Sequence, residues 1–496
     1  MINKAKGVYD LFGENGKKRL VVKNFIEELM DKFNYEYIET PIFEASALFH
    51  RGVGEGSDIV RKETYDFLDR GNRNMTLRPE GTAGTVRSFI ENKMYADGIN
   101  PKKLWYYGPM FRYERPQSGR YRQFVQFGCE CFGSDDPITD AEIISIPVTL
   151  FRMLGLKGIK VNINSLGDEE SRNNYHNALV EYLKPHLKDL CEDCKERFEK
   201  NPLRILDCKV DKESEILKNA PKAIDYLNDS SKEHFNKVLK YLDALEIEYN
   251  VNPNIIRGLD YYTHTVFEIE ADVKDFGAQN VMCGGGRYNN LVSSLEGPQT
   301  SAVGFAIGIE RLMMALEYEN IKLINDDGID CYLVGLSENE KDFALALTHT
   351  LRMLGIKSEI DSASRSLKSN FKQAEKLNSK FVLIIGEEEL KENKINIKNM
   401  KTKEEYSVPT NQIIEFIFTS LEDACSCGCE HDHEHNCSCN DECSCEENCD
   451  CEHNHEHNCN CGHSNECHCD NECNCGDDCN CNKEHKCNDN CTCNKK

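Results

Sequence analysis

The chain has 496 residues and a formal net charge of −25, and its length predicts two to four domains rather than one core. No run of 18 apolar residues occurs, which excludes a membrane-spanning helix, and the first residues lack the apolar stretch of a secretory signal. We therefore expect a cytoplasmic protein. Much of the charge lies in residues 422–496, which hold 19 acidic and 4 basic side chains. The mildly acidic remainder can still carry a local basic face for nucleic acid.

The N-terminal segment predicts a helix followed by a strand. Residues 16–33 place their apolar side chains on one helical face. Residues 35–43 read as an extended segment with Pro41 inside it. Proline has no N–H to donate to a sheet, so we expect this strand at a sheet edge or an interface.

The middle of the chain alternates strands with one long polar, helical region. That region covers about 168–240 and is predicted to be a helical insertion. A glycine cluster follows the last strand, and a strand-to-helix segment bearing Arg311 closes this part. The predicted strands are 103–113, 121–132, 159–164 and 265–270.

The segment from about 329 to 421 repeats short strands and helices, which predicts a small α/β domain with a partly parallel sheet. Its strands are predicted at 331–336, 356–361 and 380–386, and its helices at 339–354, 366–378 and 411–421. Beyond residue 421 almost nothing apolar remains, so no further core is expected.

Three separated stretches place charged residues within apolar strands, which is costly unless the charges are paired or used. In strand geometry Arg112, Gln126 and Glu130 fall at even spacing, so they can project from one face of a hairpin. A structural ion-pair network is the alternative for any one residue, but three such stretches together favour a functional site. They cover residues 76–89, 106–133 and 255–270.

The motifs in these stretches resemble those of class II aminoacyl-tRNA synthetases, and within that class histidyl-tRNA synthetases. FRYERPQSGRYRQF with GCE is similar to the second class II motif, GFAIGIERL to the third, and YEYIETPIFE to the dimer-forming first. RGLDYYTHTVFE and GGGRYNNL are similar to the two histidyl-specific stretches, and LRPEGTA and VNINSLGD add agreement. The resemblance runs from about residue 4 to about residue 420.

This resemblance implies an α+β fold whose class II antiparallel sheet is flanked by helices. Residues 1–325 would form the catalytic domain with the insertion, residues 326–421 an α/β anticodon-binding domain, and residues 422–496 a Cys/His-rich tail that is disordered without metal. The implied activity is that of a homodimeric histidine–tRNA ligase. Its implied partners are L-histidine, ATP with Mg²⁺, and tRNA(His).

The resemblance also assigns roles to single residues. Arginine forks bind phosphate and carboxylate oxygens bidentately. By resemblance Arg112 holds the α-phosphate and the substrate carboxylate, and Arg311 holds the distal phosphates. Arg257 is the third catalytic residue, a cation in place of a metal ion, and Glu114 joins the ATP site.

The histidine site is implied in the same way. Glu80, Thr82 and Gln126 match residues that receive the α-amino group, whereas Glu130 and Tyr262 match those on the two imidazole nitrogens. The whole matched set is Glu80, Gly81, Thr82, Gln126, Glu130, Tyr261 and Tyr262.

Two basic segments are candidates for tRNA contacts. Arg115 and Arg120 lie in the charged loop 114–121, which would meet the acceptor end. Arg365 and Lys368 begin a run of basic residues at helical spacing, and a solvated helix face is the alternative interpretation.

Several smaller motifs have plainer interpretations. GGGRYNNL taken alone predicts a turn, GVGEGSD at 52–58 predicts a mobile loop, and His264 is read as incidental. Cys191 and Cys194 form a CxxC motif with Cys208 further on. This set is one ligand short of a four-cysteine zinc site, so we expect free thiols there rather than a structural metal.

The tail is the strongest metal signal in the sequence. Residues 425–496 hold 20 Cys and 9 His with Cys-x-Cys pairs throughout, and such side chains are ligands for Zn²⁺ or Cu⁺. Metal buffering or sensing, a metal-dependent protein contact, and an appendage without function are the three interpretations. The first predicted ligands are Cys425, Cys427, Cys437, Cys439, Cys443 and Cys445.

Two other functions compete with ligation. One is a catalytically silent paralogue that regulates histidine biosynthesis, although such proteins generally lack the anticodon domain and part of the catalytic motifs. The other is a metal-buffering protein built on a synthetase scaffold, which the presence of Arg112, Arg257 and Arg311 disfavours.

Overall fold

The computed structural model describes residues 2–425 apart from 55–56, 58, 201, 209, 212, 256–260, 274–279 and 325–327. The chain divides into two compact units, Met1–Gly328 and a second one that begins at Ile329. Among the residues described, no helix is long and apolar enough to cross a bilayer.

The first unit is organised by an eight-stranded sheet in the order β1-β5-β6-β11-β10-β9-β7-β8. Every pairing from β5 to β7 is antiparallel, and only the two edge pairs are parallel. This confirms the predicted class II antiparallel sheet. The strands are β1 Glu36–Tyr37, β5 Lys102–Phe111, β6 Gln123–Phe132, β7 Ile159–Ser165, β8 Tyr249–Val251, β9 Thr263–Ala271, β10 Val281–Arg287 and β11 Ala302–Gly308.

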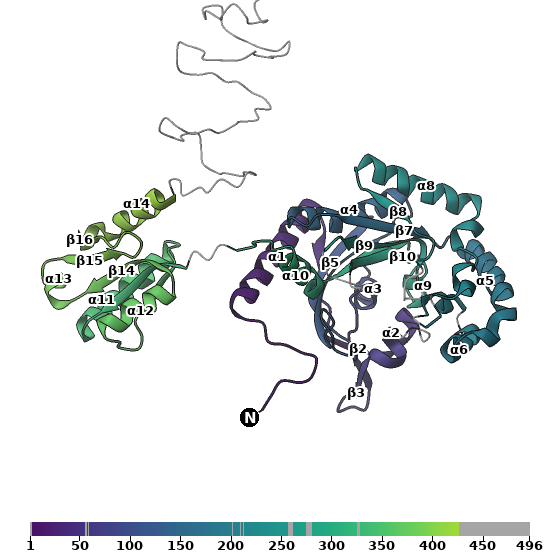
Figure 1. Cartoon of the computed structure of the whole chain (residues 1–496), viewed down its shortest axis with the longest axis horizontal. Coiled ribbons are helices and arrows are strands. Elements are labelled where there is room, and N and C mark those ends of the chain that lie inside the picture. The colour runs from purple at the N-terminus through teal and green to yellow at the C-terminus, as the bar shows by residue number, and fades with distance from the viewer. Residues whose placement is uncertain are drawn as a thin grey trace, which may run out of the picture. The chain divides into compact units, whose positions relative to one another are not determined.

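Helices cover both faces of this sheet, with α4 and α8 on one side and α3 on the other (Figure 1). The larger core lies under α1, α4, α8 and α10, whose apolar stripes pack on one sheet face. A second core lies between the opposite face and α3. The helices are α1 Gly13–Lys32, α3 Thr82–Glu91, α4 Pro137–Met153, α8 Asp229–Ala244, α9 Leu291–Ser294 and α10 Ile309–Tyr318.

The predicted strand at 35–43 is interrupted in the structure. Glu36–Tyr37 forms β1 at the sheet edge, as expected, but Pro41 falls between β1 and the start of a separate small sheet. Because proline lacks an N–H, the chain leaves one sheet before it and enters the other after it. The small sheet holds β2 Phe43–Ala45, β3 Tyr65–Leu68 and β4 Asn74–Leu77, with α2 Ser46–Val53, the π-helix Ile59–Glu63 and the 3₁₀ turn Met94–Ala96 near it in the chain.

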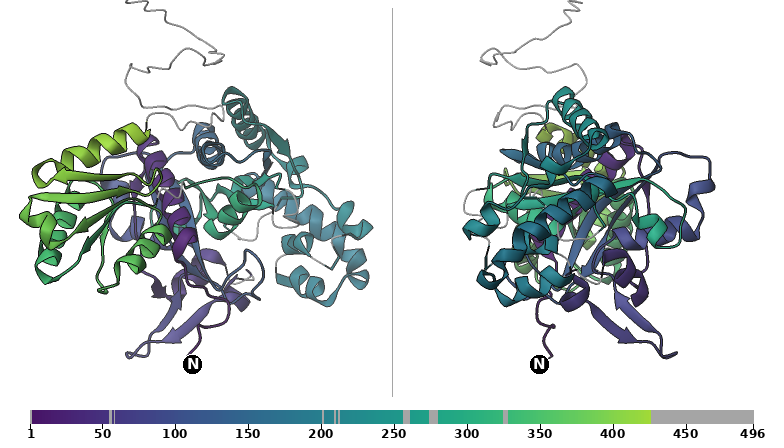
Figure 2. Two further views of the ribbon diagram at one scale, coloured as in Figure 1. Left: turned by 60° about the vertical axis from the view of Figure 1, so that its left-hand side comes forward. Right: turned by 90° about the vertical axis from the view of Figure 1, so that its right-hand side faces the viewer.

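The insertion is a helical module with its own small apolar core, and its helices α5 and α6 gather at one end of the unit (Figures 1 and 2). Short 3₁₀ segments separate its helices where the sequence shows polar breaks. Its elements before α8 are α5 Glu169–Leu183, Lys184–Asp189, α6 Glu192–Lys200, Pro202–Asp207, α7 Glu215–Lys218 and Ala223–Tyr226.

The second unit is a five-stranded sheet in the order β13-β12-β14-β15-β16. Its first three strands are parallel, but β15 and β16 continue antiparallel, and the sequence prediction missed both because they are short and polar on one face. The elements are β12 Ile329–Gly335, α11 Glu338–Met353, β13 Ser358–Ile360, α12 Leu367–Lys376, β14 Ser379–Ile385, α13 Glu387–Lys391, β15 Lys394–Asn399, β16 Glu405–Pro409, the 3₁₀ turn Thr410–Gln412 and α14 Ile413–Cys425.

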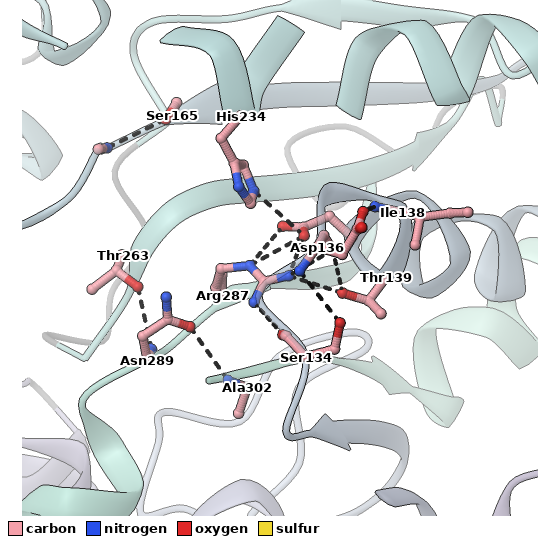
Figure 3. A network of polar contacts seen from close by, with 12 residues as sticks. Ser134, Asp136, Ile138, Thr139, Ser165, His234, Thr263, Arg287, Asn289 and Ala302 are labelled. Carbon is pink, nitrogen blue, oxygen red and sulfur yellow. Dashed lines mark hydrogen bonds and ion pairs between the residues drawn. The ribbon is translucent and has the colours of Figure 1, made fainter. Parts of the chain in front are cut away.

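A buried ion pair anchors α4 to the sheet (Figure 3). Arg287, at the end of β10, is fully buried and donates through Nε to both carboxylate oxygens of Asp140 at 3.1 and 3.2 Å. Its other nitrogens donate to the carbonyl of Ser134 at 2.7 Å and the hydroxyl of Thr139 at 2.9 Å. Burial alone would raise the pKa of Asp140, but the charge and hydrogen bonds of Arg287 lower it by a larger amount. The net pKa is lowered, so the carboxylate stays ionised.

Replacing Arg287 by Met should lower the free energy of unfolding by about 3–5 kcal/mol, because Asp140 would remain buried without its main partner. Chemical denaturation followed by circular dichroism measures the loss, and Arg73→Met, at an exposed arginine, is the control. Adding Asp140→Leu should restore part of the stability. An unchanged unfolding midpoint for Arg287→Met would contradict this account.

Candidate active site

The site begins with the alternation of side chains along β6. Phe127 and Cys129 point into the larger core, while Gln126, Gly128 and Glu130 point to the opposite face, toward α3. Cross-strand pairing of β6 with β11 places Glu130 directly opposite Gly304. Polar side chains therefore come to lie on the floor of a pocket whose underside is apolar.

One pocket brings together most of the residues singled out in the sequence. Of that set, Gly81 and Arg115 do not line it: Gly81 is buried beneath the pocket wall and Arg115 is exposed. Arg257 lies outside the described residues, and Arg365 and Lys368 belong to the second unit. The predicted residues that line the pocket are Glu80, Thr82, Arg112, Glu114, Arg120, Gln126, Glu130, Tyr261, Tyr262 and Arg311.

One end of the pocket is built on two buried carboxylates. Glu130 accepts hydrogen bonds from the hydroxyls of Thr82 at 2.7 Å and Tyr106 at 3.5 Å, and from Tyr288. Glu80 accepts from the backbone N–H groups of Thr82 and Ala83 at 2.8 Å each, at the start of α3. Two acceptor side chains ringed by hydroxyls can bind a small ligand that carries N–H donors.

Burial dominates the protonation of both carboxylates. It raises the pKa of Glu130 to about 8, against the opposing hydrogen bonds from Tyr288 and Thr82. Burial also raises the pKa of Glu80, although the backbone donors at the start of α3 oppose this shift. Near neutral pH the two carboxyl groups therefore do not both carry a full negative charge, unless a cation or a hydrogen-bond donor enters the pocket.

The other end of the pocket is cationic. The Arg112 Nε atom donates to the carbonyl of Pro79 at 2.8 Å, and its guanidinium lies 5.2 Å from the ring centre of Phe124. Arg311 donates to the carbonyl of Val281 at 2.7 Å. Burial lowers the pKa of Arg311, and the nearby charge of Arg120 adds to the effect.

The charges of Glu114 and Glu268 offset the three guanidinium groups only in part. Glu114 accepts a hydrogen bond from Arg120 at 3.3 Å, and the charge of Arg112 also acts on Arg311. Permanently charged guanidinium groups around one pocket attract an anion with several oxygens, such as a polyphosphate. The arrangement thus supports an anionic ligand at one end and a hydrogen-bond donor at the other.

The turn expected at GGGRYNNL is found only at Asn289 and Asn290, because its glycines lie within β10 on the pocket floor. A Cβ atom on Gly285 would lie 2.3 Å from the carbonyl oxygen of Gly304, and one on Gly304 would lie 1.9 Å from Oε2 of Glu130. Glycine is required here for close approach of strands and of the carboxylate, a demand that local sequence cannot distinguish from a turn.

Sequence reasoning missed Tyr288 and Glu310, which line the pocket, and Tyr106, which contacts Glu130. Tyr106 and Tyr288 donate to Glu130, and both were read only as parts of longer motifs. Glu310, within GFAIGIERL, accepts from the backbone N–H of Val125 at 3.0 Å and from Arg19 at 3.1 Å, so it fixes β6 to the N-terminal helix. Because each contact joins segments far apart in the chain, no local pattern identifies them.

His264 does not line the pocket, in agreement with its reading as incidental. Its ring lies 5.0 Å from that of His234, which is also half-buried, and burial lowers the pKa of His264 to about 4. In the tail, Cys425 is the last residue of α14. Its side chain and the predicted ligands Cys427, Cys437, Cys439, Cys443 and Cys445 lie outside what the structure describes.

Comparison with known proteins identifies the families to which the two units are similar. The histidyl-tRNA synthetase family matches residues 7–312, and the anticodon binding domain family matches residues 330–419. A histidine–tRNA ligase of Geobacillus sp. (strain WCH70) is 50% identical over 412 residues, which cover 83% of this chain and 97% of that protein. The histidine–tRNA ligase of Bacillus subtilis (strain 168) is 47% identical over 412 residues, 83% of this chain and 97% of that protein.

Solved structures agree with the sequence matches. The crystal structure of apo S. aureus histidyl-tRNA synthetase superposes with a TM-score of 0.73 at 41% identity, covering 84% of this chain and 100% of that one. A histidyl-tRNA synthetase from Nostoc sp. PCC 7120, at 18% identity and a TM-score of 0.60, shares the fold. The family resemblance read from the motifs is confirmed, and the chain belongs to the histidyl-tRNA synthetase family.

Proposed function

We propose that the chain is a histidine–tRNA ligase, which activates L-histidine with the Mg²⁺ complex of ATP and transfers it to tRNA(His). The observation that carries the proposal is the two-ended pocket. Its buried carboxylates and tyrosines suit the N–H groups of histidine, and its arginines suit the phosphates of ATP.

Activation joins two anions, because the histidine carboxylate attacks the α-phosphate and pyrophosphate leaves. Arg112 would neutralise both reacting groups, and Arg311, deeper along the cationic end, would hold the distal phosphates. Glu114 restrains Arg120 at the rim and would contact the nucleotide. Arg257 is proposed as the remaining catalytic cation from the sequence motif alone.

Histidine would be recognised through both of its polar groups. Glu80, Thr82 and Gln126 would receive the α-amino group, with Gly81 beneath them in the wall, and Glu130 and Tyr262 would contact the imidazole nitrogens. Tyr261, whose ring centre lies 4.7 Å from that of Tyr262, would hold it in place. A site that hydrogen-bonds its substrate rejects analogues that leave its own groups unpaired, so no editing site is needed.

The tRNA would be bound by two separate basic segments. Arg115 and Arg120 lie between β5 and β6, beside the pocket, where an acceptor end must enter. In the second unit Lys368 is exposed on α12, whereas Arg365 precedes that helix and pairs with Asp361 at 2.7 Å. We therefore assign Lys368 a direct phosphate contact and Arg365 a role in positioning the start of the helix.

The same proposal includes a cytoplasmic homodimer. Apolar side chains of the two adjoining sheet edges are exposed in the single chain, namely Tyr37 in β1 and Ile42 and Phe43 at the start of β2. Exposed apolar residues clustered at a sheet edge are suited to a subunit interface. The tail is proposed to bind Zn²⁺ or Cu⁺ through Cys425, Cys427, Cys437, Cys439, Cys443 and Cys445.

Histidine-dependent exchange of pyrophosphate into ATP tests the proposal. We expect exchange with histidine and none with other amino acids, and a loss of about a hundredfold or more for Arg311→Ala or Arg257→Ala, because each removes a charge from the transition state. Arg73→Ala is the exposed-arginine control. A folded protein without exchange would favour the silent regulatory paralogue instead.

Glu130→Gln should separate stability from substrate binding. The folded-state pKa of about 8 lies above the ordinary value of 4.5, so the folded protein keeps a proton that the unfolded chain releases, and stability falls as pH rises through that window. Glutamine removes this cost. We expect the gain in unfolding temperature of the ligand-free variant to grow between about pH 4.5 and about pH 8, then level off.

The same variant should raise the KM for histidine at least tenfold, because a neutral amide loses the charge-assisted contact to the imidazole. Glu233→Gln, at an exposed site on α8, is the matched control for both measurements. A pH-independent difference in unfolding temperature would show that Glu130 is ionised in the folded state throughout.

Deletion of the tail after Leu421 should change histidine-dependent exchange by less than about twofold. The reason is that the match to the anticodon binding domain ends at residue 419, and the matched region spans nearly the full length of the relatives. Exchange rates of the full and shortened chains, each treated with and without a chelator, make the comparison. A large loss on deletion would assign the tail a part in catalysis.

A further inference from the structure

Four potential metal ligands converge in the helical insertion, away from the pocket. The donor atoms of Cys191, Cys194, Cys208 and Asp211 all lie within 4.8 Å of one another. Cys191 immediately precedes α6 and Cys194 lies in its first turn, while Cys208 and Asp211 follow the 3₁₀ segment Pro202–Asp207. The sequence pointed to the three thiols, and the fold adds Asp211 as a fourth ligand.

The distances fit a tetrahedral ion. Zn–S bonds of about 2.3 Å in a tetrahedron separate neighbouring sulfurs by about 3.8 Å. The Sγ atoms of Cys191 and Cys208 are 3.6 Å apart, and Sγ of Cys208 lies 3.6 Å from Oδ2 of Asp211. A disulfide requires about 2.05 Å between sulfurs, so these cysteines are free thiols placed as the edge of a ligand set.

The surroundings hold these ligands in place. The backbone N–H of Cys191 donates to Oδ2 of Asp211 at 3.0 Å, and the backbone N–H of Asp211 donates to Sγ of Cys208 at 3.4 Å. Cys194 and Cys208 are buried, at 0% and 3% exposure. A carboxylate among three thiols does not suit apolar packing, whereas it does suit a soft or borderline cation.

We propose that Cys191, Cys194, Cys208 and Asp211 bind one structural Zn²⁺ ion. Their spacing, C-x₂-C-x₁₃-C-x₂-D, is close to that of four-cysteine zinc sites with aspartate in the last position. All four positions are filled by protein ligands, so the ion is structural rather than catalytic. The inference does not rest on the proposed ligase activity.

The ion would join two short elements that otherwise share only a small core. It links the start of α6, a short and mostly polar helix, to the turn after Pro202–Asp207. Glu196 of α6 pairs with Arg61 at 3.6 Å, in the π-helix Ile59–Glu63. The carbonyl of Glu63 accepts the N–H of Tyr113 at 2.6 Å, next to Arg112 of the pocket. The ion would therefore steady a contact between the insertion and the pocket rim.

Metal content must be measured apart from the cysteine-rich tail. A chain ending at Leu421 is suitable, because the matched region covers 100% of the S. aureus synthetase, which folds without such a tail. We expect this shortened chain to carry one zinc per molecule by elemental analysis. Loading with Co²⁺ should give the charge-transfer and visible bands of tetrahedral thiolate coordination.

Single substitutions test the ligand set. Cys208→Ala should abolish the bound zinc and the Co²⁺ bands, and Asp211→Asn should weaken Co²⁺ affinity at least tenfold while the fold persists. Asp211→Cys should retain the ion. The matched controls are Cys331→Ala, at a buried thiol of the second unit, and Asp193→Asn, at an exposed carboxylate between Cys191 and Cys194 that is not one of the four ligands. In the full chain, Cys208→Ala should lower the zinc content by one ion.

Three outcomes would overturn the site. They are a folded shortened chain that binds neither Zn²⁺ nor Co²⁺, zinc retained in full by Cys208→Ala, and a metal-free protein whose mass shows a Cys191–Cys208 disulfide. Where Cys208→Ala fails to fold, the Co²⁺ affinities of Asp211→Asn and Asp193→Asn decide, and equal values reject Asp211 as a ligand.

Discussion

The alternation of side chains along β6 is the constraint on which the rest of the site depends. One face of the strand must be apolar to hold α4 and α10 against the sheet, so its polar residues can appear only on the other face. That face meets α3, whose start presents Glu80 and Thr82 toward Glu130. The floor of the pocket is therefore a consequence of how the sheet is covered, and the loop 114–121 adds Glu114 and Arg120 to its lining.

Two buried carboxylates in this unit have pKa values shifted in opposite directions. Asp140 has Arg287 against it and remains ionised, which holds α4 in place. Glu130 has hydroxyl donors but no hydrogen-bonded cation among the residues that the structure describes, and burial raises its pKa. The first carboxylate stabilises the fold, whereas the second stays uncompensated until a ligand supplies N–H groups. Such an unfavourable environment is typical of a group kept for binding rather than for stability.

The insertion solves a different physical problem. Its helices α6 and α7 are short, and its apolar core is smaller than the one under the sheet, so burial contributes less to its order. The proposed Zn²⁺ ion, bound by three thiols and Asp211, cross-links two segments that the core holds only weakly. The ion pair between Glu196 and Arg61 joins the insertion to the π-helix Ile59–Glu63, which contacts the strand end beside the pocket.

By itself the sequence determined much of this protein. Apolar periodicity placed α1, the β5–β6 pair and the strand–helix alternation of the second unit, because those patterns depend only on neighbours within a few residues. The motifs identified the family and the main charged residues that line the pocket. Even spacing was enough to put Gln126 and Glu130 on one face, since a strand fixes that geometry locally.

Only the tertiary structure decided which distant segments meet. Gly285 and Gly286 of β10 must be glycines because backbone carbonyls of Gly304 in β11 and Thr265 in β9 leave no room for a Cβ atom, a constraint that the local sequence does not show. Tyr288 reaches Glu130, Arg287 reaches Asp140, and Asp211 completes a ligand set begun by Cys191, each across a gap that only folding closes. Local patterns report the conformation of a segment, whereas charge balance and ligand sets are properties of segments brought together.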